Sequence, residues 1–223
     1  MSPQRISLNI KIFELGSQRA EALASLKPPE LIAEVLQEFQ GELPFLGTRP
    51  ESYALRLASS TSRLDDQLPL SEQSLVNSPN LILDEREVTL PTGAAPLSKA
   101  AYLREPNSGQ VYRLWWQPAL IGRPHPGKSG DLLLAVNLDS LQEGRKASRR
   151  QALLTERKGQ FYITNLSPKN PFIVMTEKDG QPKKYSIEEG EYPLRDKDQL
   201  SLGGDSIRLV FRLNALETKS LTK

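Results

Sequence analysis

The fold of this chain is decided by the run Gln160-Phe161-Tyr162-Ile163-Thr164-Asn165-Leu166-Ser167-Pro168-Lys169-Asn170. Its first part alternates apolar and polar residues, which predicts a β-strand with one buried face. Its second part is polar and contains a proline, which predicts the loop after that strand. Two earlier polar groups, Ile121-Gly122-Arg123 and Ser148-Arg149-Arg150-Gln151, also adjoin apolar alternation. All three groups therefore belong to strand ends or loops, where a rigid scaffold commonly places binding residues.

Working outward from this run, strand candidates recur about every ten residues in the second half of the chain, a spacing typical of an all-β sandwich. Turn signals such as Lys158-Gly159 and Gly203-Gly204 separate these candidates. The predicted strands are Val111–Trp116, Leu132–Val136, Ala152–Thr155, Phe161–Ile163, Phe172–Met175 and Ile207–Leu213.

The three polar groups resemble the motifs of the forkhead-associated (FHA) domain, a β-sandwich that binds phosphothreonine peptides. In that family the motifs read Gly-Arg, then Ser-x-x-His, then Asn-Gly. The resemblance covers residues 101–214 of this chain. Gln151 stands where the family has His, and Pro171 stands where it has Gly.

The resemblance implies that the phosphopeptide is bound by Arg123, Ser148, Arg149, Lys169 and Asn170, with Gly122 and Gln151 supporting the pocket. The chemistry fits these roles, because a phosphothreonine carries about −1.5 to −2 charges and three acceptor oxygens. Arg123 offers a planar fork of donors, and Ser148 offers a hydroxyl. The amide of Asn170 has both a donor and an acceptor for a peptide backbone. Gln151 likewise has both, so it is able to replace the supporting role of the family's His.

The first half of the chain has a different pattern. Alternating apolar residues over Ile6–Ile12 predict a strand, and helical spacing after Lys27-Pro28-Pro29-Glu30 predicts a helix that stops at Gly41. Further strands are predicted at Tyr53–Leu57 and Leu81–Leu83. This order resembles the ubiquitin-like β-grasp, including the small ubiquitin-like proteins of bacterial type VII secretion. Another small α+β domain is the alternative interpretation.

These patterns predict two domains. Residues 1–90 form the ubiquitin-like domain, 91–100 a linker of small residues and prolines, 101–214 the FHA-like sandwich and 215–223 a polar tail. The charges divide along the same line. Residues 1–90 hold 8 basic and 13 acidic residues, a net charge of −5, whereas residues 91–223 hold 21 and 14, a net charge of +7. A phosphopeptide site accounts for part of the basic excess.

Composition excludes several classes of function. The chain has no cysteine and one histidine, His125, so thiol catalysis, disulfides and zinc clusters are not expected. His125 either tunes binding with pH or is a plain loop residue. No enzyme site, cofactor or metal is predicted. No apolar run is long enough for a signal peptide or a membrane span, and we expect a cytoplasmic protein without membrane insertion.

Three hypotheses remain from the sequence. The first is a non-enzymatic adaptor whose FHA-like domain binds a phosphothreonine-containing protein and whose ubiquitin-like domain binds a second protein. The alternative is a structural assembly subunit whose pocket no longer needs phosphate, as the residues Gln151 and Pro171 would allow. Nucleic-acid binding by Arg145, Lys146, Arg149 and Arg150 ranks last, because no aromatic residues are interleaved with this cluster.

Overall fold

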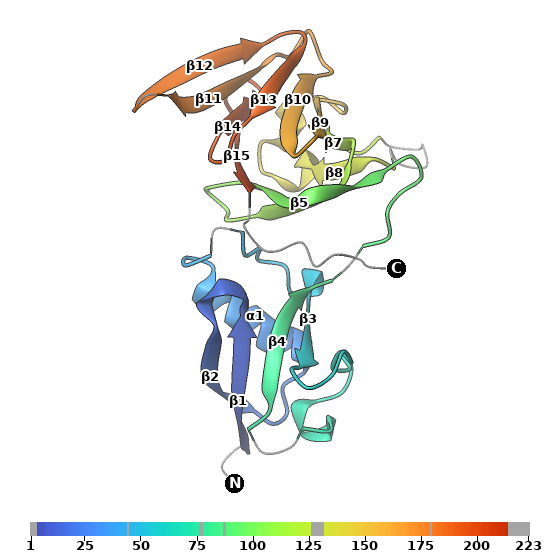
Figure 1. Ribbon diagram of the computed structural model, residues 1–223, viewed down its shortest axis with the longest axis vertical. Coiled ribbons are helices and arrows are strands. Elements are labelled where there is room, and N and C mark those ends of the chain that lie inside the picture. Colours follow the sequence, from blue (N-terminus) through green and yellow to red (C-terminus); the bar gives the residue numbers. More distant parts are fainter. Residues whose placement is uncertain are drawn as a thin grey trace. The chain divides into compact units, whose positions relative to one another are not determined.

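The computed structural model describes residues 4–43, 45–75, 78–86, 88–125, 132–178 and 180–213. The chain divides into two compact units, Met1–Glu87 and Val88–Lys223. Figure 1 shows the first unit in blue to cyan-green and the second in green to red. Among the described residues, no helix has the length and apolar character needed to cross a membrane.

The described part of the first unit contains one mixed sheet in the order β2-β1-β4-β3. Strands β1 and β2 form an antiparallel hairpin, β1 pairs in parallel with β4, and β3 pairs antiparallel with β4. The helix α1 lies against a face of this sheet (Figure 1). The elements are β1 (Arg5–Ile12), η1 (Phe13–Leu15), β2 (Ser17–Leu23), α1 (Pro28–Phe39), η2 (Pro50–Ser52), β3 (Tyr53–Leu57), η3 (Leu70–Glu72) and β4 (Asn80–Glu85).

The α1 helix follows from its sequence. Pro28 begins it, and the carboxylate of Glu30 accepts a hydrogen bond from the Lys27 N–H at 2.8 Å, which satisfies a donor at the helix start. The helix buries one apolar stripe, made of Leu31, Ile32, Val35 and Leu36. Strand β2 was not predicted, because most of its side chains are partly or fully exposed and its sequence lacks apolar alternation.

The second unit is a β-sandwich, which confirms the fold class predicted for the second half. Within the described residues, one sheet has the order β13-β10-β9-β7-β8 and the other β12-β11-β14-β15-β5-β6. The strands are β5 (Ala95–Arg104), β6 (Val111–Gln117), β7 (Ala119–Gly122), β8 (Leu134–Asn137), β9 (Ala152–Arg157), β10 (Gln160–Asn165), β11 (Phe172–Lys178), β12 (Gln181–Ile187), β13 (Glu191–Leu194), β14 (Gln199–Leu202) and β15 (Ile207–Leu213), with short 3-10 turns η4 (Leu138–Ser140) and η5 (Gly144–Lys146).

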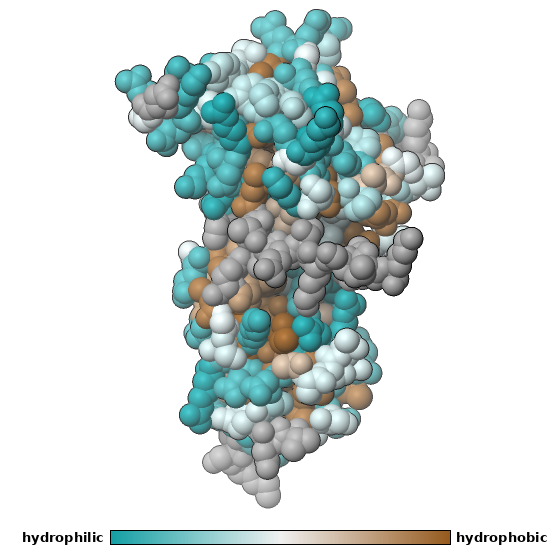
Figure 2. All heavy atoms as spheres, in the orientation of Figure 1, coloured by the Kyte–Doolittle hydropathy of each residue, from teal (hydrophilic) through white to brown (hydrophobic). Residues whose placement is uncertain are grey.

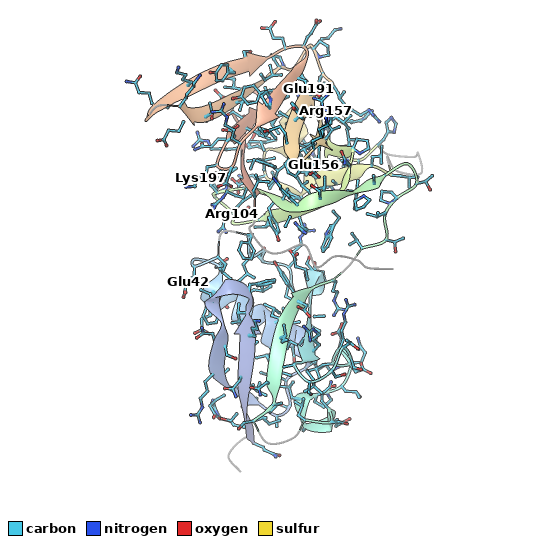
Figure 3. The ribbon with its side chains drawn as sticks, in the orientation of Figure 1. Glu42, Arg104, Glu156, Arg157, Glu191 and Lys197 are labelled. Atoms are coloured by element: carbon cyan, nitrogen blue, oxygen red, sulfur yellow. The ribbon has the colours of Figure 1, made fainter. Side chains whose placement is uncertain are left out.

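The core of the sandwich is built by both sheets. Phe161 of one sheet and Phe211 of the other are almost fully buried, with ring centroids 5.3 Å apart. On the five-stranded sheet, Arg157 of β9 forms an ion pair with Glu191 of β13, and the two labelled side chains lie close together in Figure 3. The β11–β12 hairpin carries a hydrophilic surface (Figure 2), in keeping with the exposed side chains of β12.

The predicted linker at 91–100 differs from the structure. Strand β5 already begins at Ala95, which is opposite Gln117 of β6, and Pro96 is opposite Trp116. Ser98 donates its backbone N–H to the carboxylate of Glu156 at 2.7 Å. Small residues and prolines indicated a linker, but these long-range partners hold residues 95–100 in the sheet. The predicted tail at 215–223 lies outside the described residues.

Candidate functional site

Strand direction brings the three polar groups of the sequence to one end of the five-stranded sheet. Strand β9 is antiparallel to both β7 and β10. The same end of the sheet therefore holds the end of β7 at Gly122, the start of β9 at Ala152 and the end of β10 at Asn165. The loops that contain Arg123, Ser148 and Asn170 meet there, and hydrogen bonds join them.

Gly122 permits the closest of these approaches. A Cβ atom at this position would lie 2.0 Å from the carbonyl oxygen of Arg149, far inside van der Waals contact. The adjacent backbone forms a short ladder, in which the Arg123 N–H donates to Arg149 O at 3.1 Å and the Gln151 N–H donates to Ile121 O at 2.9 Å. Glycine therefore fixes the distance between the arginine loop and the serine loop.

Arg123 is half-buried next to the serine loop. Its Nε donates to the carbonyl oxygen of Ala147 at 2.8 Å, which holds the guanidinium beside Ser148. Within the described ranges, its two terminal nitrogens have no hydrogen-bond partner. The fork is thus oriented by the protein and keeps donors for an anion.

Ser148 forms a hydroxyl pair that the sequence did not reveal. Its Oγ lies 2.7 Å from the Oγ of Ser167, and either atom is able to donate. A pair of hydroxyls uses one hydrogen internally and leaves the other for a ligand. Ser167 belongs to the quoted run, but nothing in its spacing distinguished it from an ordinary turn serine.

Gln151 is the buried centre of the site, with 0% of its surface exposed. Its Oε1 accepts from the Ser148 N–H at 2.9 Å and from Asn170 Nδ2 at 3.0 Å. Its Nε2 donates to Asn170 O at 2.7 Å. One neutral amide therefore joins the serine loop to the β10–β11 loop.

Asn170 directs its amide nitrogen into the protein. Besides Gln151, Nδ2 lies within hydrogen-bonding distance of Lys146 O at 3.2 Å and of Ser148 Oγ at 3.4 Å. Its Oδ1 accepts no hydrogen bond from any residue that the structure describes. The side chain of Asn170 therefore keeps only its acceptor, Oδ1, for a peptide backbone.

Arg149 and Lys169 are exposed at the rim of the site. Arg149 Nη1 lies 3.5 Å from His125 Nε2, which places the single histidine beside the serine loop.

Pro171 lies directly before β11, whose first residue, Phe172, is fully buried.

Asn165 is a second residue that the sequence did not single out. It is 7% exposed, and its Nδ2 lies within hydrogen-bonding distance of Ser167 O at 3.2 Å, Ile187 O at 3.0 Å and Glu188 O at 2.9 Å. Its Oδ1 accepts from the Ser167 N–H at 3.0 Å. Asn165 thereby fixes the loop of Ser167 against the turn after β12. The quoted run contained this asparagine, but only the fold reveals its distant partners.

The residues that meet at this site supply cations, hydroxyls and amides. Among the described residues, no group of three or more histidine, aspartate or glutamate side chains is arranged to hold a metal ion. The arrangement suits an anion that carries several acceptor oxygens, because Arg123, Ser148 and Ser167 present donors from three different loops.

Comparison with protein-family models found no match, and comparison with curated proteins found none either. Solved structures similar to this chain include EmbR of Mycobacterium tuberculosis in complex with a low-affinity phosphopeptide. That match has 22% identity and a TM-score of 0.39, and it covers 54% of this chain and 27% of the EmbR chain.

Two isolated FHA domains are also similar. The FHA domain of human APLF in complex with an XRCC1 bisphospho peptide has 22% identity and a TM-score of 0.37, with 51% of this chain and 97% of that chain covered. The FHA domain of an Arabidopsis thaliana hypothetical protein has 14% identity and a TM-score of 0.37, with coverages of 57% and 97%.

Proposed function

We propose that the second unit is a phosphothreonine-binding module of the FHA type and that the protein is a non-enzymatic adaptor. The observation that carries the proposal is the joining of the three loops by hydrogen bonds: the buried amide of Gln151 links the serine loop to the β10–β11 loop, and Arg123 Nε donates to Ala147 O of the serine loop. Because Ala147 directly precedes Ser148, these contacts place the hydroxyl of Ser148 next to the fork of Arg123. A phosphate group requires this combination of a forked cation and short hydroxyl donors.

The contacts support a proposed role for each residue. Arg123 binds the phosphate through its terminal nitrogens, and the hydroxyl pair of Ser148 and Ser167 adds a neutral donor. Arg149 and Lys169 add charge at the rim. Asn170 receives a peptide N–H on Oδ1, and Gly122 and Gln151 hold the loops at their separation.

For the first unit we propose a ubiquitin-like β-grasp that binds a second protein. The proposal is supported by the hairpin β1–β2, the single helix α1 and the parallel pairing of β1 with β4 in a mixed sheet. The reducing cytoplasm is the proposed compartment, in accord with the absence of cysteine.

A structural subunit is the second candidate function. The observation that favours it is the engagement of Asn170 Nδ2 inside the protein, which removes one donor from the peptide. In that case the converging loops would make a constitutive protein contact without phosphate.

A peptide screen separates the two candidates. The full chain is exposed to an immobilised library in which each sequence occurs with phosphothreonine, phosphoserine and unmodified threonine. The adaptor proposal expects hits that depend on phosphate and prefer phosphothreonine. Equal capture of phosphorylated and unmodified peptides would instead favour the structural subunit.

A further inference from the structure

The first unit has a groove beside the start of α1, with a volume of about 640 Å³. Its lining comes from the first two turns of α1, from η2, from the turn that contains Asp66 and from Arg86, which follows β4. We infer that this groove binds a basic segment of a partner protein through an arginine or lysine side chain. The inference rests on the protein-binding role proposed for the first unit, and it specifies the surface and the chemistry of that contact.

Hydrogen bonds fix one wall of the groove. The backbone N–H of Arg86 donates to Ser52 O at 2.8 Å, and its Nε donates to Tyr53 O at 2.6 Å. The guanidinium of Arg86 also forms an ion pair with Asp66. Because these contacts are made within the first unit, the groove exists before a partner arrives, and binding orders few further groups.

The apolar part of the lining is built from small and cyclic side chains. Pro29 and Ala33 supply it from α1, and Pro50 supplies it from η2. Lysine and arginine carry an aliphatic stem that packs along apolar surface of this kind while the charged head reaches a polar environment. The lining therefore suits the stem of a long basic side chain.

The polar part of the lining suits the charged head. Three carboxylates, those of Glu30, Glu51 and Asp66, line the groove together with one cation, Arg86, whose charge Asp66 balances. Glu30 and Glu51 form no ion pair with any residue that the structure describes. Two negative charges of the groove are thus left for a partner.

The surroundings of the groove extend this negative charge. Glu34 is exposed one turn beyond Glu30 on the same side of α1. Lys27 and Arg49 are the closest basic residues in sequence, and neither of them lines the groove. Residues 1–90 carry a net charge of −5, which attracts a basic segment and repels an acidic one.

The open face of the sheet is a weaker candidate for this contact. On that face β1 presents the polar side chains of Ser7, Asn9 and Lys11. Arg56 of β3 and Asp84 of β4 already form an ion pair with each other. The groove, in contrast, combines apolar lining with carboxylates that have no counter-ion.

The test begins with a display library of random, unmodified seven-residue peptides selected against the full chain. Enriched peptides are synthesised and titrated calorimetrically, and amide chemical shifts of the labelled full chain locate each bound peptide. We expect peptides that contain arginine or lysine beside a small or apolar residue, that shift the amides of Ala33, Glu51 and Arg86, and that bind more weakly as salt rises.

The double variant Glu30→Gln, Glu51→Gln should lower the affinity roughly five- to tenfold, because each exposed ion pair contributes a factor of up to about five. Glutamine at position 30 still accepts the Lys27 N–H, so the helix start is retained. Ala33→Leu, which places a larger side chain in the groove, should weaken binding without changing the charge. Glu21→Gln is the matched control, since it removes an exposed charge from β2, at the opposite edge of the sheet from β3.

Three results would overturn the inference. The first is a set of enriched peptides that bind the first unit without basic residues or with unchanged affinity in the double variant, which would leave the protein-binding role of that unit intact. The second is self-association of the full chain in sedimentation that the double variant abolishes, because the occupant would then be a second copy. The third is a library in which no peptide binds the first unit, and this result would also count against the protein-binding role.

The phosphopeptide screen keeps the second unit separate from this test. Arg123→Ala should bind the groove peptides as wild type does, and the double variant at Glu30 and Glu51 should bind phosphopeptides as wild type does. A failure of the phosphothreonine proposal is therefore distinguishable from a failure of the groove.

Discussion

At the scale of single residues, the site depends on two positions that contribute no charge. Gly122 sets how closely the arginine loop approaches the serine loop, and Gln151 connects the serine loop to Asn170. The neutral amide of Gln151 has no proton to gain or lose in the physiological range. The geometry of these loops is therefore expected to be insensitive to protonation at this position.

The first prediction concerns Gly122→Ala. The new methyl group would lie 2.0 Å from Arg149 O, so the backbone of one loop must move. We expect a loss of stability of about 1–3 kcal/mol, the usual cost of overpacking, together with weaker phosphopeptide binding. Thermal unfolding and calorimetric titration measure the two effects.

Gly41→Ala is the control for this substitution, since no atom lies within 4 Å of a Cβ placed there and the backbone φ is not positive. Wild-type stability and binding for Gly122→Ala would show that the close approach of the two loops is not required.

At the scale of elements, the sequence predicted those strands whose buried faces alternate clearly, such as β1, β10 and β15. The sequence pattern did not predict strands that are held by partners far away along the chain. Strand β12 has six exposed residues and only Ile187 buried, so no apolar period indicates it. Small residues and prolines predict a linker over residues 91–100, but Gln117 and Glu156 pair with Ala95 and Ser98 within this segment.

The candidate site shows the same contrast between residues that the sequence suggests and residues that only the fold reveals. The motif order that resembles the FHA family predicts Arg123 and Ser148 as site residues, and the structure places both on the converging loops. Ser167 and Asn165 were missed, because their importance comes from Ser148 Oγ and from the Ile187 and Glu188 carbonyls. Those partners are brought near only by the fold.

The second prediction concerns the β5–β6 turn. Glu105 is 7% exposed and accepts hydrogen bonds from the backbone N–H groups of Asn107 at 3.0 Å and Ser108 at 2.5 Å. Burial acts to raise the pKa of Glu105, but the side-chain and backbone hydrogen bonds of Ser108 and the backbone N–H of Asn107 outweigh it and lower the pKa from its ordinary value of 4.5.

Because the folded state has the lower pKa, the carboxylate stabilises the fold above pH 4.5, and this contribution is lost as pH falls through the folded-state pKa. We expect Glu105→Gln to cost about 1–2 kcal/mol at neutral pH and progressively less on acidification. Denaturant unfolding from pH 7 to pH 3 measures this trend. The exposed Glu72→Gln serves as control. An equal loss at all pH values for Glu105→Gln would refute the role of its charge.

At the scale of the whole molecule, the acidic first half and the basic second half correspond to two compact units with separate cores. The proposed adaptor would use this division, since each unit would bind its own partner. An exposed segment that connects two compact units is a preferred site of proteolytic cleavage.

The third prediction follows from this organisation. Val88 is 43% exposed and Leu90 is 39% exposed, whereas pairing with β6 begins at Ala95. Limited proteolysis should therefore cut between residues 88 and 94 and leave two stable fragments, identified by mass spectrometry. Rapid degradation of both halves without these intermediates would contradict independent folding of the units.

The central claim is that the converging loops bind phosphate through Arg123. The most direct measurement is calorimetric titration of wild type, Arg123→Ala and Arg19→Ala with one phosphothreonine peptide and its unphosphorylated twin. Arg19 is an exposed residue of β2, so Arg19→Ala removes the same charge from the first unit instead of from the site. We predict that wild type and Arg19→Ala bind only the phosphorylated peptide, and that Arg123→Ala loses about 2–5 kcal/mol of binding free energy while remaining folded. Equal binding of the two peptides by wild type, or unchanged affinity in Arg123→Ala, would contradict the account.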